Sequence, residues 1–260
     1  MRYFAGIDIG ASTTKSVVIN ESKEILGRHV VKSGADLPAA AQVTYQQALR
    51  EAGLQPRDIH LIATTGFGRH NFPGAQRTIT EISCHTRGAF HYFPRPITIV
   101  DIGGQDNKVI HVDGTGRIIN FKMNRKCAAG TGTFIEEIAY KMDLPLGELN
   151  RLAKESVKDL RLGIYCTVFR ATEILTKIRI GEKKEDIVRG VFCSVAQRII
   201  EMDPLEGDVV MTGGVVAHNE IIAELLGLLT NKKILLPPEP QIIGALGAAL
   251  IVIPYAEEKV

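Results

Sequence analysis

The sequence GIDIGASTTKSVV occupies residues 6–18, and IVDIGGQDNKVI occupies residues 99–110. Both stretches begin as an apolar strand, reach Asp and Gly, pass through a short polar turn and return to an apolar strand. At an offset of 93 residues, Asp8, Ile9, Gly10 and Lys15 are repeated as Asp101, Ile102, Gly103 and Lys108. Four identities in one strand–turn–strand frame indicate two similar halves, rather than two unrelated hairpins that share turn residues.

Around these stretches, strand-like and helix-like segments alternate, as they do in α/β folds. Asp36 and Gly53 bound a predicted helix as its N-cap and its stop signal. Thr80 is expected to cap another helix, which ends near residue 90. Pro94 and Pro96 follow and are the best candidates for a linker between the two halves.

The composition excludes several classes of protein. Of 260 residues, 45% are hydrophobic and 23% are charged, which is typical of a soluble globular protein. The net charge of +2 argues against a protein built to bind nucleic acid. Asp8 interrupts the first apolar stretch too early for a signal peptide, and the apolar run 242–254 is shorter than the roughly 18 residues of a membrane span. We therefore expect a cytoplasmic protein that binds neither nucleic acid nor membranes.

The two repeated stretches have the features of phosphate-binding turns. Gly and Ser/Thr in a tight turn can direct backbone N–H groups and hydroxyls at phosphate oxygens. An Asp at the end of the preceding strand can hold a hydrated Mg²⁺ ion. Two such hairpins would bind the phosphates of a nucleotide from both sides. The sequence contains neither a Walker P-loop nor a dinucleotide fingerprint after a strand.

A third glycine-rich turn occurs in VVMTGGV at residues 209–215. The apolar strand ends in Gly213 and Gly214, and we expect a helix to begin near Asn219. Paired glycines let the backbone approach a flat ring or a ribose closely. Alone, the pattern is equally typical of a plain strand–helix turn.

The four cysteines differ in their surroundings. Cys127 follows two basic residues in NRKCAAGTG (124–132) and precedes a predicted helix from Thr133 to Lys141, and both features favour a thiolate. Cys166, in GIYCTVF (163–169), can be a core residue or a ligand, while Cys84 and Cys193 are interpreted as structural. A symmetric dimer could combine two cysteines from each chain into a four-thiolate site for Zn²⁺ or a [4Fe–4S] cluster. The spacing decides neither the metal nor the dimer.

The three glycine-rich turns together resemble a known superfamily. DIGAST (8–13), DIGGQ (101–105) and MTGGV (211–215), in this order, are similar to the two phosphate motifs and the adenosine motif of the actin, sugar-kinase and heat-shock ATPases. The resemblance implies an α/β fold of two ribonuclease-H-like domains around a nucleotide cleft. Residues 1–95 would form the first domain, with the C-terminal helix 245–260 packed on it. Residues 96–244 would form the second and carry the cysteines.

A narrower resemblance comes from KCAAGTG (126–132) and CTVF (166–169). These motifs resemble the activators of 2-hydroxyacyl-CoA dehydratases, which belong to the same ATPase family as the ATP-binding subunits of benzoyl-CoA reductases. The resemblance covers essentially the whole chain. It implies a homodimer bridged by one [4Fe–4S] cluster. ATP hydrolysis would drive one low-potential electron, supplied by ferredoxin or flavodoxin, into a partner iron–sulfur dehydratase or reductase.

The resemblance also implies roles for individual residues. The cluster ligands would be Cys127 and Cys166. Catalysis of ATP hydrolysis would involve Asp8, Asp101 beside Mg²⁺, and Gln105. The residues that contact the nucleotide, or that link it to the cluster, would be Ser12, Thr13, Thr14, Lys15, Gly103, Gly104, Gly130, Thr131, Gly132, Gly213 and Gly214.

One segment departs from the family pattern. After CTVF the activators continue Ala-Glu-Ser-Glu, whereas this chain has Arg170-Ala171-Thr172-Glu173. The departure leaves the identity of the partner open. Two other functions compete with the activator: a small-molecule kinase on the same fold, for which Asp36 and Asp58 lack a supporting motif, and a nucleotide-switched binding module with zinc or no metal.

Overall fold

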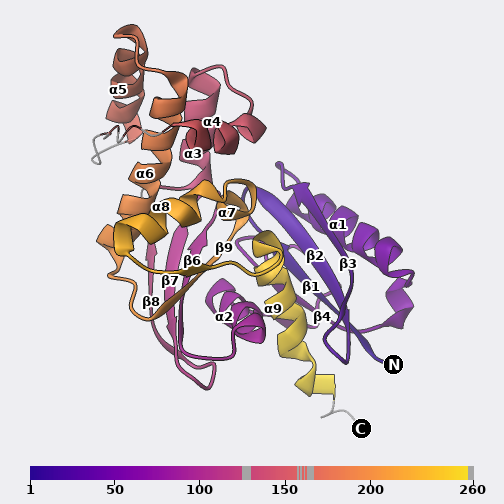
Figure 1. The fold of residues 1–260 in the computed structure, drawn as a ribbon. Helices are drawn as coiled ribbons and strands as arrows, with labels where there is room; N and C mark the ends of the chain where they lie inside the picture. Colours follow the sequence, from indigo (N-terminus) through magenta and orange to yellow (C-terminus); the bar gives the residue numbers. More distant parts are fainter. Residues whose placement is uncertain (125–129, 157, 159, 161, 163–166, 257–260) are drawn as a thin grey trace. The chain divides into compact units, whose positions relative to one another are not determined.

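The computed structural model describes residues 1–124, 130–156, 158, 160, 162 and 167–256 (Figure 1). The chain forms two compact units. The first contains residues Met1–Pro96, Val112–Ile119 and Gln241–Val260, and the second contains Ile97–His111 and Asn120–Pro240. Within the described residues, no helix is long and apolar enough to cross a membrane.

The first unit is built on a five-stranded sheet. Its strands are β1 (Tyr3–Ile9), β2 (Thr13–Asn20), β3 (Ile25–Lys32), β4 (Ile59–Thr65) and β5 (Arg77–Thr78), in the order β3-β2-β1-β4-β5. β1 pairs antiparallel with β2 and parallel with β4. Because side chains alternate along a strand, β1 is buried on both faces.

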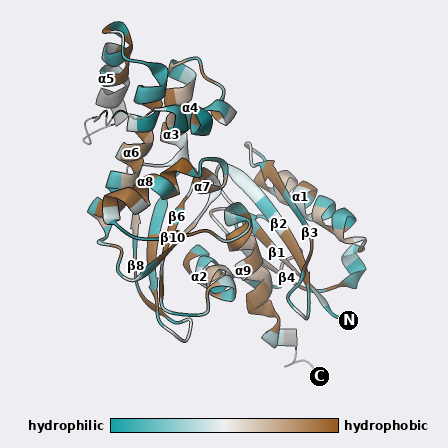
Figure 2. Ribbon diagram, in the orientation of Figure 1, coloured by the Kyte–Doolittle hydropathy of each residue, from teal (hydrophilic) through white to brown (hydrophobic). Residues whose placement is uncertain are grey.

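Each face of β1 packs against a different helix. Ala5, Ile7 and Ile9 belong to one apolar cluster with α1 (Leu37–Ala52). A methyl group added to Gly6, on the opposite face, would meet the backbone of α9 (Ile243–Val252). α9 is apolar on all sides, as Figure 2 shows, and it also packs on α2 (Glu81–Tyr92).

The helix boundaries predicted from the sequence are confirmed in this unit. The Asp36 carboxylate accepts a hydrogen bond from the Ala39 N–H at 2.9 Å, and Gly53 ends α1 in the left-handed conformation with φ 68°. Thr80 caps α2 by accepting from the Ser83 N–H at 3.3 Å. The ends of α1 and the start of α2 are therefore set by capping residues that can be recognised in the sequence alone.

The second unit repeats the same sheet topology. Its strands are β6 (Ile97–Ile102), β7 (Asn107–Val112), β8 (Ile118–Asn124), β9 (Asp208–Thr212) and β10 (Ile234–Leu235), in the order β8-β7-β6-β9-β10. β6 and β9 are parallel, as β1 and β4 are. The positions of β6 to β10 therefore correspond to those of β1 to β5, which confirms the internal repeat.

Helices complete the second unit. They are α3 (Gly132–Lys141), α4 (Leu149–Glu155), α5 (Thr167–Arg179), α6 (Lys184–Met202), α7 (Gly214–His218) and α8 (Ile221–Thr230). α6 packs against both α4 and α8. The apolar core extends from β6 and β9 through these helices. This second core is the support for the glycine-rich turns at the ends of β6 and β9.

The contact between α9 and α2 depends on a glycine, and this contact can be tested. A Cβ atom at position 247 would lie 1.8 Å from the Cys84 carbonyl oxygen, so Gly247→Ala forces backbone apart. We expect the free energy of unfolding to fall by at least about 3 kcal/mol, the upper end of the usual cost of overpacking. Urea denaturation followed by circular dichroism measures this change.

The matched control is Gly147→Ala, because a Cβ atom there meets nothing within 4 Å. Its effect should stay within about 0.5 kcal/mol. Equal stability of the two variants would contradict the close packing of α9 on α2.

Candidate functional site

The first phosphate-type hairpin begins with a buried ion pair. Asp8 lies at the end of β1, directly opposite Lys15 in the β1–β2 register. The Lys15 Nζ lies 3.1 Å from the Asp8 Oδ2, and the two side chains are 13% and 9% exposed. The lysine therefore neutralises a carboxylate that burial would otherwise penalise.

The turn of this hairpin is anchored to β3. Gly10 N–H donates to the Thr13 carbonyl at 3.1 Å and closes the turn. The Ser33 hydroxyl donates to the Gly10 carbonyl at 2.6 Å, and the Ser33 N–H donates to the Ser12 carbonyl at 3.0 Å. Thr14 is fully buried and its hydroxyl shares a hydrogen bond with Ser33. Ser12 and Thr13 are partly exposed.

The second hairpin has the same construction with a more deeply buried lysine. Lys108 is 2% exposed, and its Nζ lies 3.2 Å from the Asp101 Oδ2 and 2.8 Å from the Asp106 Oδ1. Gly103 N–H donates to the Asp106 carbonyl at 2.9 Å, as Gly10 does to Thr13. The Thr212 hydroxyl donates to the other Asp101 oxygen at 3.0 Å.

Each buried aspartate lies beside a glycine that directly follows the parallel neighbouring strand. A Cβ atom at Gly66, which follows β4, would lie 2.6 Å from Asp8 Oδ1. A Cβ atom at Gly213, which follows β9, would lie 2.8 Å from Asp101 Oδ1. Both glycines have positive φ angles, 92° and 101°, which disfavour other residues. Position 213 thus requires glycine for two reasons: its positive φ angle and the Asp101 carboxylate, which leaves no room for a side chain.

The turn after β9 differs from the prediction in one respect. A helix does begin near Asn219, since α8 starts at Ile221, but the short helix α7 (Gly214–His218), which ends with Asn219 as its C-cap, was not predicted. The strand–helix turn is therefore tighter than the sequence suggested. Gly213 is the N-cap of α7, and its N–H donates to the Pro240 carbonyl at 2.9 Å.

The structure joins the second hairpin to the start of α3. Gly132 N–H donates to the Gly103 carbonyl at 2.9 Å, and the Asn107 amide donates to the Gly130 carbonyl at 2.8 Å. Thr131 is the buried N-cap of α3, which begins one residue before the predicted start at Thr133. Predicted site residues from two separate motifs are therefore in direct contact.

Both hairpins offer backbone donors suited to phosphate. Among the described residues, no protein acceptor takes the N–H groups of Ala11 and Ser12, or those of the equivalent Gly104 and Gln105. Phosphate oxygens readily accept such turn N–H groups, and the adjacent aspartates suit the hydration shell of Mg²⁺. The residues present fit a magnesium-bound nucleotide.

The cysteines fall into two groups. Cys127 and Cys166, the predicted cluster ligands, lie outside the described residues. Cys84 is buried in α2, and burial raises the pKa of its thiol to about 12, so it remains protonated. Cys193 lies partly buried in α6. Within the part of the chain that the structure describes, no group of three or more His, Cys, Asp or Glu side chains is arranged to hold a metal ion.

Sequence reasoning missed several residues of this site: Asp106, Asn107, Lys108, Thr133 and Thr212. Lys108 was part of the internal repeat, so its equivalence to Lys15 was a usable signal. The contacts of Asn107 and Thr133 join segments more than 20 residues apart and leave no local pattern.

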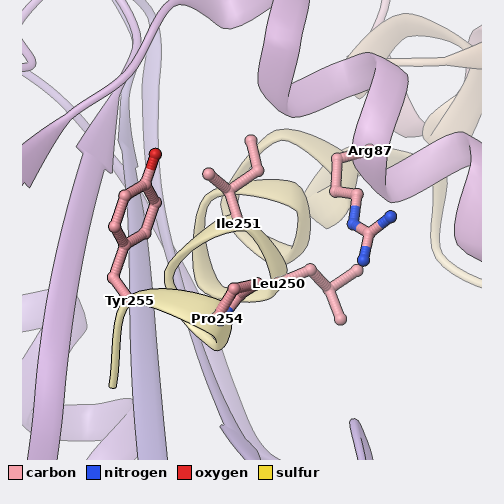
Figure 3. Close-up of a pocket in the computed structure, with 5 residues that line it drawn as sticks. All are labelled: Arg87, Leu250, Ile251, Pro254 and Tyr255. Carbon is pink, nitrogen blue, oxygen red and sulfur yellow. The ribbon is translucent and has the colours of Figure 1, made fainter. Parts of the chain in front are cut away.

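A separate hollow lies in the first unit and contains none of the predicted site residues. It has a volume of about 410 Å³ and is lined by Arg87, Leu250, Ile251, Pro254 and Tyr255. Figure 3 shows these side chains around the C-terminal end of α9. Its open, mostly apolar lining lacks convergent polar groups, so we assign it no part in the chemistry of the hairpins.

Comparison with known proteins identifies close relatives along the whole chain. The model of the BadF/BadG/BcrA/BcrD ATPase family matches residues 5–252. The activator of lactoyl-CoA dehydratase from Anaerotignum propionicum is 38% identical over 260 residues, which cover 99% of this chain and 100% of the relative.

Two solved structures add to this comparison. The activator of 2-hydroxyisocaproyl-CoA dehydratase from Clostridium difficile, with bound ADPNP, is 36% identical with a TM-score of 0.92, and 98% of this chain and 96% of that chain are covered. A ROK family glucokinase from Streptomyces griseus is 12% identical with a TM-score of 0.57, covering 96% of this chain and 98% of that chain. The second likeness shows the fold alone, and the expected actin-like α/β fold is confirmed.

The buried lysine of the second hairpin provides a test of the site. Lys108→Met leaves the Asp101 and Asp106 carboxylates without their shared cation. Breaking a buried ion pair on one side typically lowers the free energy of unfolding by about 3–5 kcal/mol, and we expect a loss in this range. Urea denaturation measures it.

Lys141→Met is the matched control, because Lys141 pairs with Glu137 on the surface of α3. Exposed pairs contribute about 0–1 kcal/mol. If Lys108→Met were as mild as this control, the pairing of Lys108 would not be what stabilises the hairpin.

Proposed function

Because the chain belongs to the BadF/BadG/BcrA/BcrD ATPase family, we propose that it is an ATP-dependent activator that reduces a partner iron–sulfur enzyme. The partner is of the 2-hydroxyacyl-CoA dehydratase or benzoyl-CoA reductase type. The observation that carries the proposal is the bonding of the second hairpin to the start of α3, five residues after Cys127. This bonding gives a nucleotide at the hairpin a short route to the cysteine motif.

In this proposal, the hairpins bind ATP and Mg²⁺. Backbone N–H groups of both turns, with the hydroxyls of Ser12 and Thr13, bind phosphate oxygens, and Lys15 lies beside them. Asp8 and Asp101 orient the hydrated Mg²⁺, and Gln105 orients the attacking water. Gly213 and Gly214 lie along the adenosine. Thr14 supports the turn from inside the sheet.

The proposal assigns the cysteine motifs to a metal cluster. Cys127 and Cys166 of two copies hold one [4Fe–4S] cluster in a homodimer, and this cluster supplies one-electron transfer at low potential. Support comes from the basic residues before Cys127 and from the helix that begins after it, since both favour a thiolate. Ferredoxin or flavodoxin is the proposed electron donor, and the cytoplasm is the proposed location. The division into domains 1–95 with 245–260, and 96–244, belongs to the same proposal.

The kinase alternative is not favoured. A full-length relative at 38% identity is a dehydratase activator, whereas the sugar-kinase likeness at 12% identity extends only to the fold. Asp36 caps α1, and Asp58 accepts from the Gln55 N–H at 2.7 Å, so both have local structural roles. The segment 170–172 still differs from the activators, and the particular partner is left open on that account.

The cluster is tested by metal analysis of the anaerobically purified protein. We expect about four iron and four sulfide per dimer, lost in both Cys127→Ser and Cys166→Ser. Cys193→Ser is the control and should keep its iron, because Cys193 is assigned a structural position in α6. A wild-type protein that stays colourless and free of iron after anaerobic reconstitution would contradict the electron-transfer function.

Hydrolysis of ATP is tested at the second hairpin. Asp101→Asn should lower kcat about 100-fold or more, as does the loss of one group that stabilises charge in a transition state. Asp113→Asn, in an exposed turn, is the matched control and should hydrolyse ATP at the wild-type rate. Equal kcat values for the two variants would remove Asp101 from the catalytic machinery. Partner reduction is then measured with ATP and a low-potential reductant.

A further inference from the structure

We propose that the peptide groups of Gly103 and Gly104 connect a phosphate bound at the second hairpin to the first turn of α3, and that Thr133 positions this connection. The inference rests on the proposed binding of ATP at this hairpin. It adds the route by which the nucleotide acts on the helix that follows the Cys127 motif.

The first turn of α3 is bound to the hairpin by several short hydrogen bonds. The Gly103 carbonyl accepts from the Gly132 N–H at 2.9 Å. The Gly104 carbonyl accepts twice from Thr133, from its N–H at 2.8 Å and from its hydroxyl at 2.7 Å. Thr133 thus holds one hairpin carbonyl with two donors, so the helix cannot begin elsewhere without losing both.

The geometry of the peptide group places the phosphate donors on the opposite side. The Gly104 carbonyl and the Gln105 N–H belong to one planar peptide unit and point in opposite directions. The same holds for the Gly103 carbonyl and the Gly104 N–H. Among the described residues, no protein acceptor takes either N–H group. Each peptide unit therefore has its carbonyl on α3 and its N–H available to a phosphate oxygen.

A ligand on these N–H groups necessarily affects α3. Hydrogen bonds in series polarise one another, so a phosphate on the N–H strengthens the bond at the carbonyl of the same unit. A rotation of the peptide plane to meet the phosphate would also displace the donors on the first turn of α3. The γ-phosphate, present in ATP and absent in ADP, supplies the difference between the two states.

The first hairpin shows that this connection is specific to the second. In the first hairpin, the Gly10 carbonyl, which is equivalent to that of Gly103, accepts from the hydroxyl of Ser33, the residue that directly follows β3. The Ser12 carbonyl in the same turn accepts from the Ser33 N–H. The first turn is therefore bonded to the end of the edge strand of a five-stranded sheet, whereas the second turn is bonded to the first residues of a helix that follows Gly130. The carbonyls of the two hairpins therefore accept hydrogen bonds from different elements. Among the described residues, it is the second hairpin whose carbonyls accept from α3, the helix that follows the Cys127 motif in the sequence.

A second side chain, that of Asn107, also joins the second hairpin to the segment just before α3. Asn107, at the start of β7, is 2% exposed and donates from its amide to the Gly130 carbonyl at 2.8 Å. It is the neighbour of Lys108, which pairs with Asp101. The loop before α3 is thus held at Gly130 as well as at Gly132 and Thr133.

Thr133 allows a clean test because its side chain is exposed, so removing the hydroxyl should not unfold the protein. Amide hydrogen exchange of residues 134–141 is measured on the full-length protein at saturating Mg²⁺ and either ADPNP or ADP. In the wild type, exchange should be slower with ADPNP. Thr133→Val should lower the ratio of the exchange rate with ADP to the rate with ADPNP about two- to tenfold, the effect of one hydrogen bond, and Thr133→Ser should restore this ratio.

Thr230→Val is the matched control, since Thr230 also donates its hydroxyl to a carbonyl, at 2.6 Å in α8. It should behave as the wild type does. A wild-type ratio in Thr133→Val, or a failure of Thr133→Ser to restore it, would overturn the role of Thr133.

Two further outcomes separate the inference from the function. If calorimetry shows that ADPNP binds but exchange in α3 is the same with ADPNP and ADP, the connection is wrong and the proposed ATPase stands. If neither nucleotide binds, both the connection and the proposed function are wrong.

Discussion

A carboxylate buried at the end of a central strand is the constraint on which the two units depend. A buried negative charge is costly unless a cation pairs with it, and in both units the cation comes from the next strand across a tight turn. In the first unit, the two paired residues lie directly opposite each other in the hairpin register. The carboxylate also leaves no room for a side chain just after the parallel strand beside it, where Gly66 and Gly213 are found. The repeated Asp and Lys thus follow from one electrostatic requirement, and Gly66 and Gly213 leave room for the carboxylates that it places there.

The two copies of this design have diverged in what supports the turn. In the first unit, Ser33, which directly follows β3, is hydrogen-bonded to the turn, and the buried Thr14 hydroxyl shares a hydrogen bond with the Ser33 hydroxyl. In the second, the turn is bonded to α3 and Lys108 holds two carboxylates in place of one. A hairpin bonded to a helix can transmit a change, whereas one bonded to a sheet mainly provides a fixed surface. Local contacts therefore give equivalent motifs different roles.

The sequence predicted those features that rest on neighbouring residues. The caps of α1 and α2 were visible because Asp36, Gly53 and Thr80 act within four residues of themselves. The internal repeat was visible because the Asp–Lys pair spans one short hairpin. The short helix α7 was not predicted, because paired glycines look like a longer turn when the buried carboxylate beside Gly213 is unknown. The bonds from Asn107 and Thr133 join distant segments, so only the folded chain reveals them.

The thiols illustrate how surroundings, rather than residue type, decide chemistry. Cys84 lies in the first unit near Asp8, where burial and the nearby carboxylate both raise the pKa of its thiol. A protonated thiol adds no negative charge beside the hairpin that we propose to bind anionic phosphate. Cys127 instead follows Arg125 and Lys126 in the sequence, and basic neighbours stabilise a thiolate. The fold keeps the thiol near the first hairpin neutral, whereas our proposal assigns metal chemistry to the Cys127 motif, which precedes α3 in the sequence.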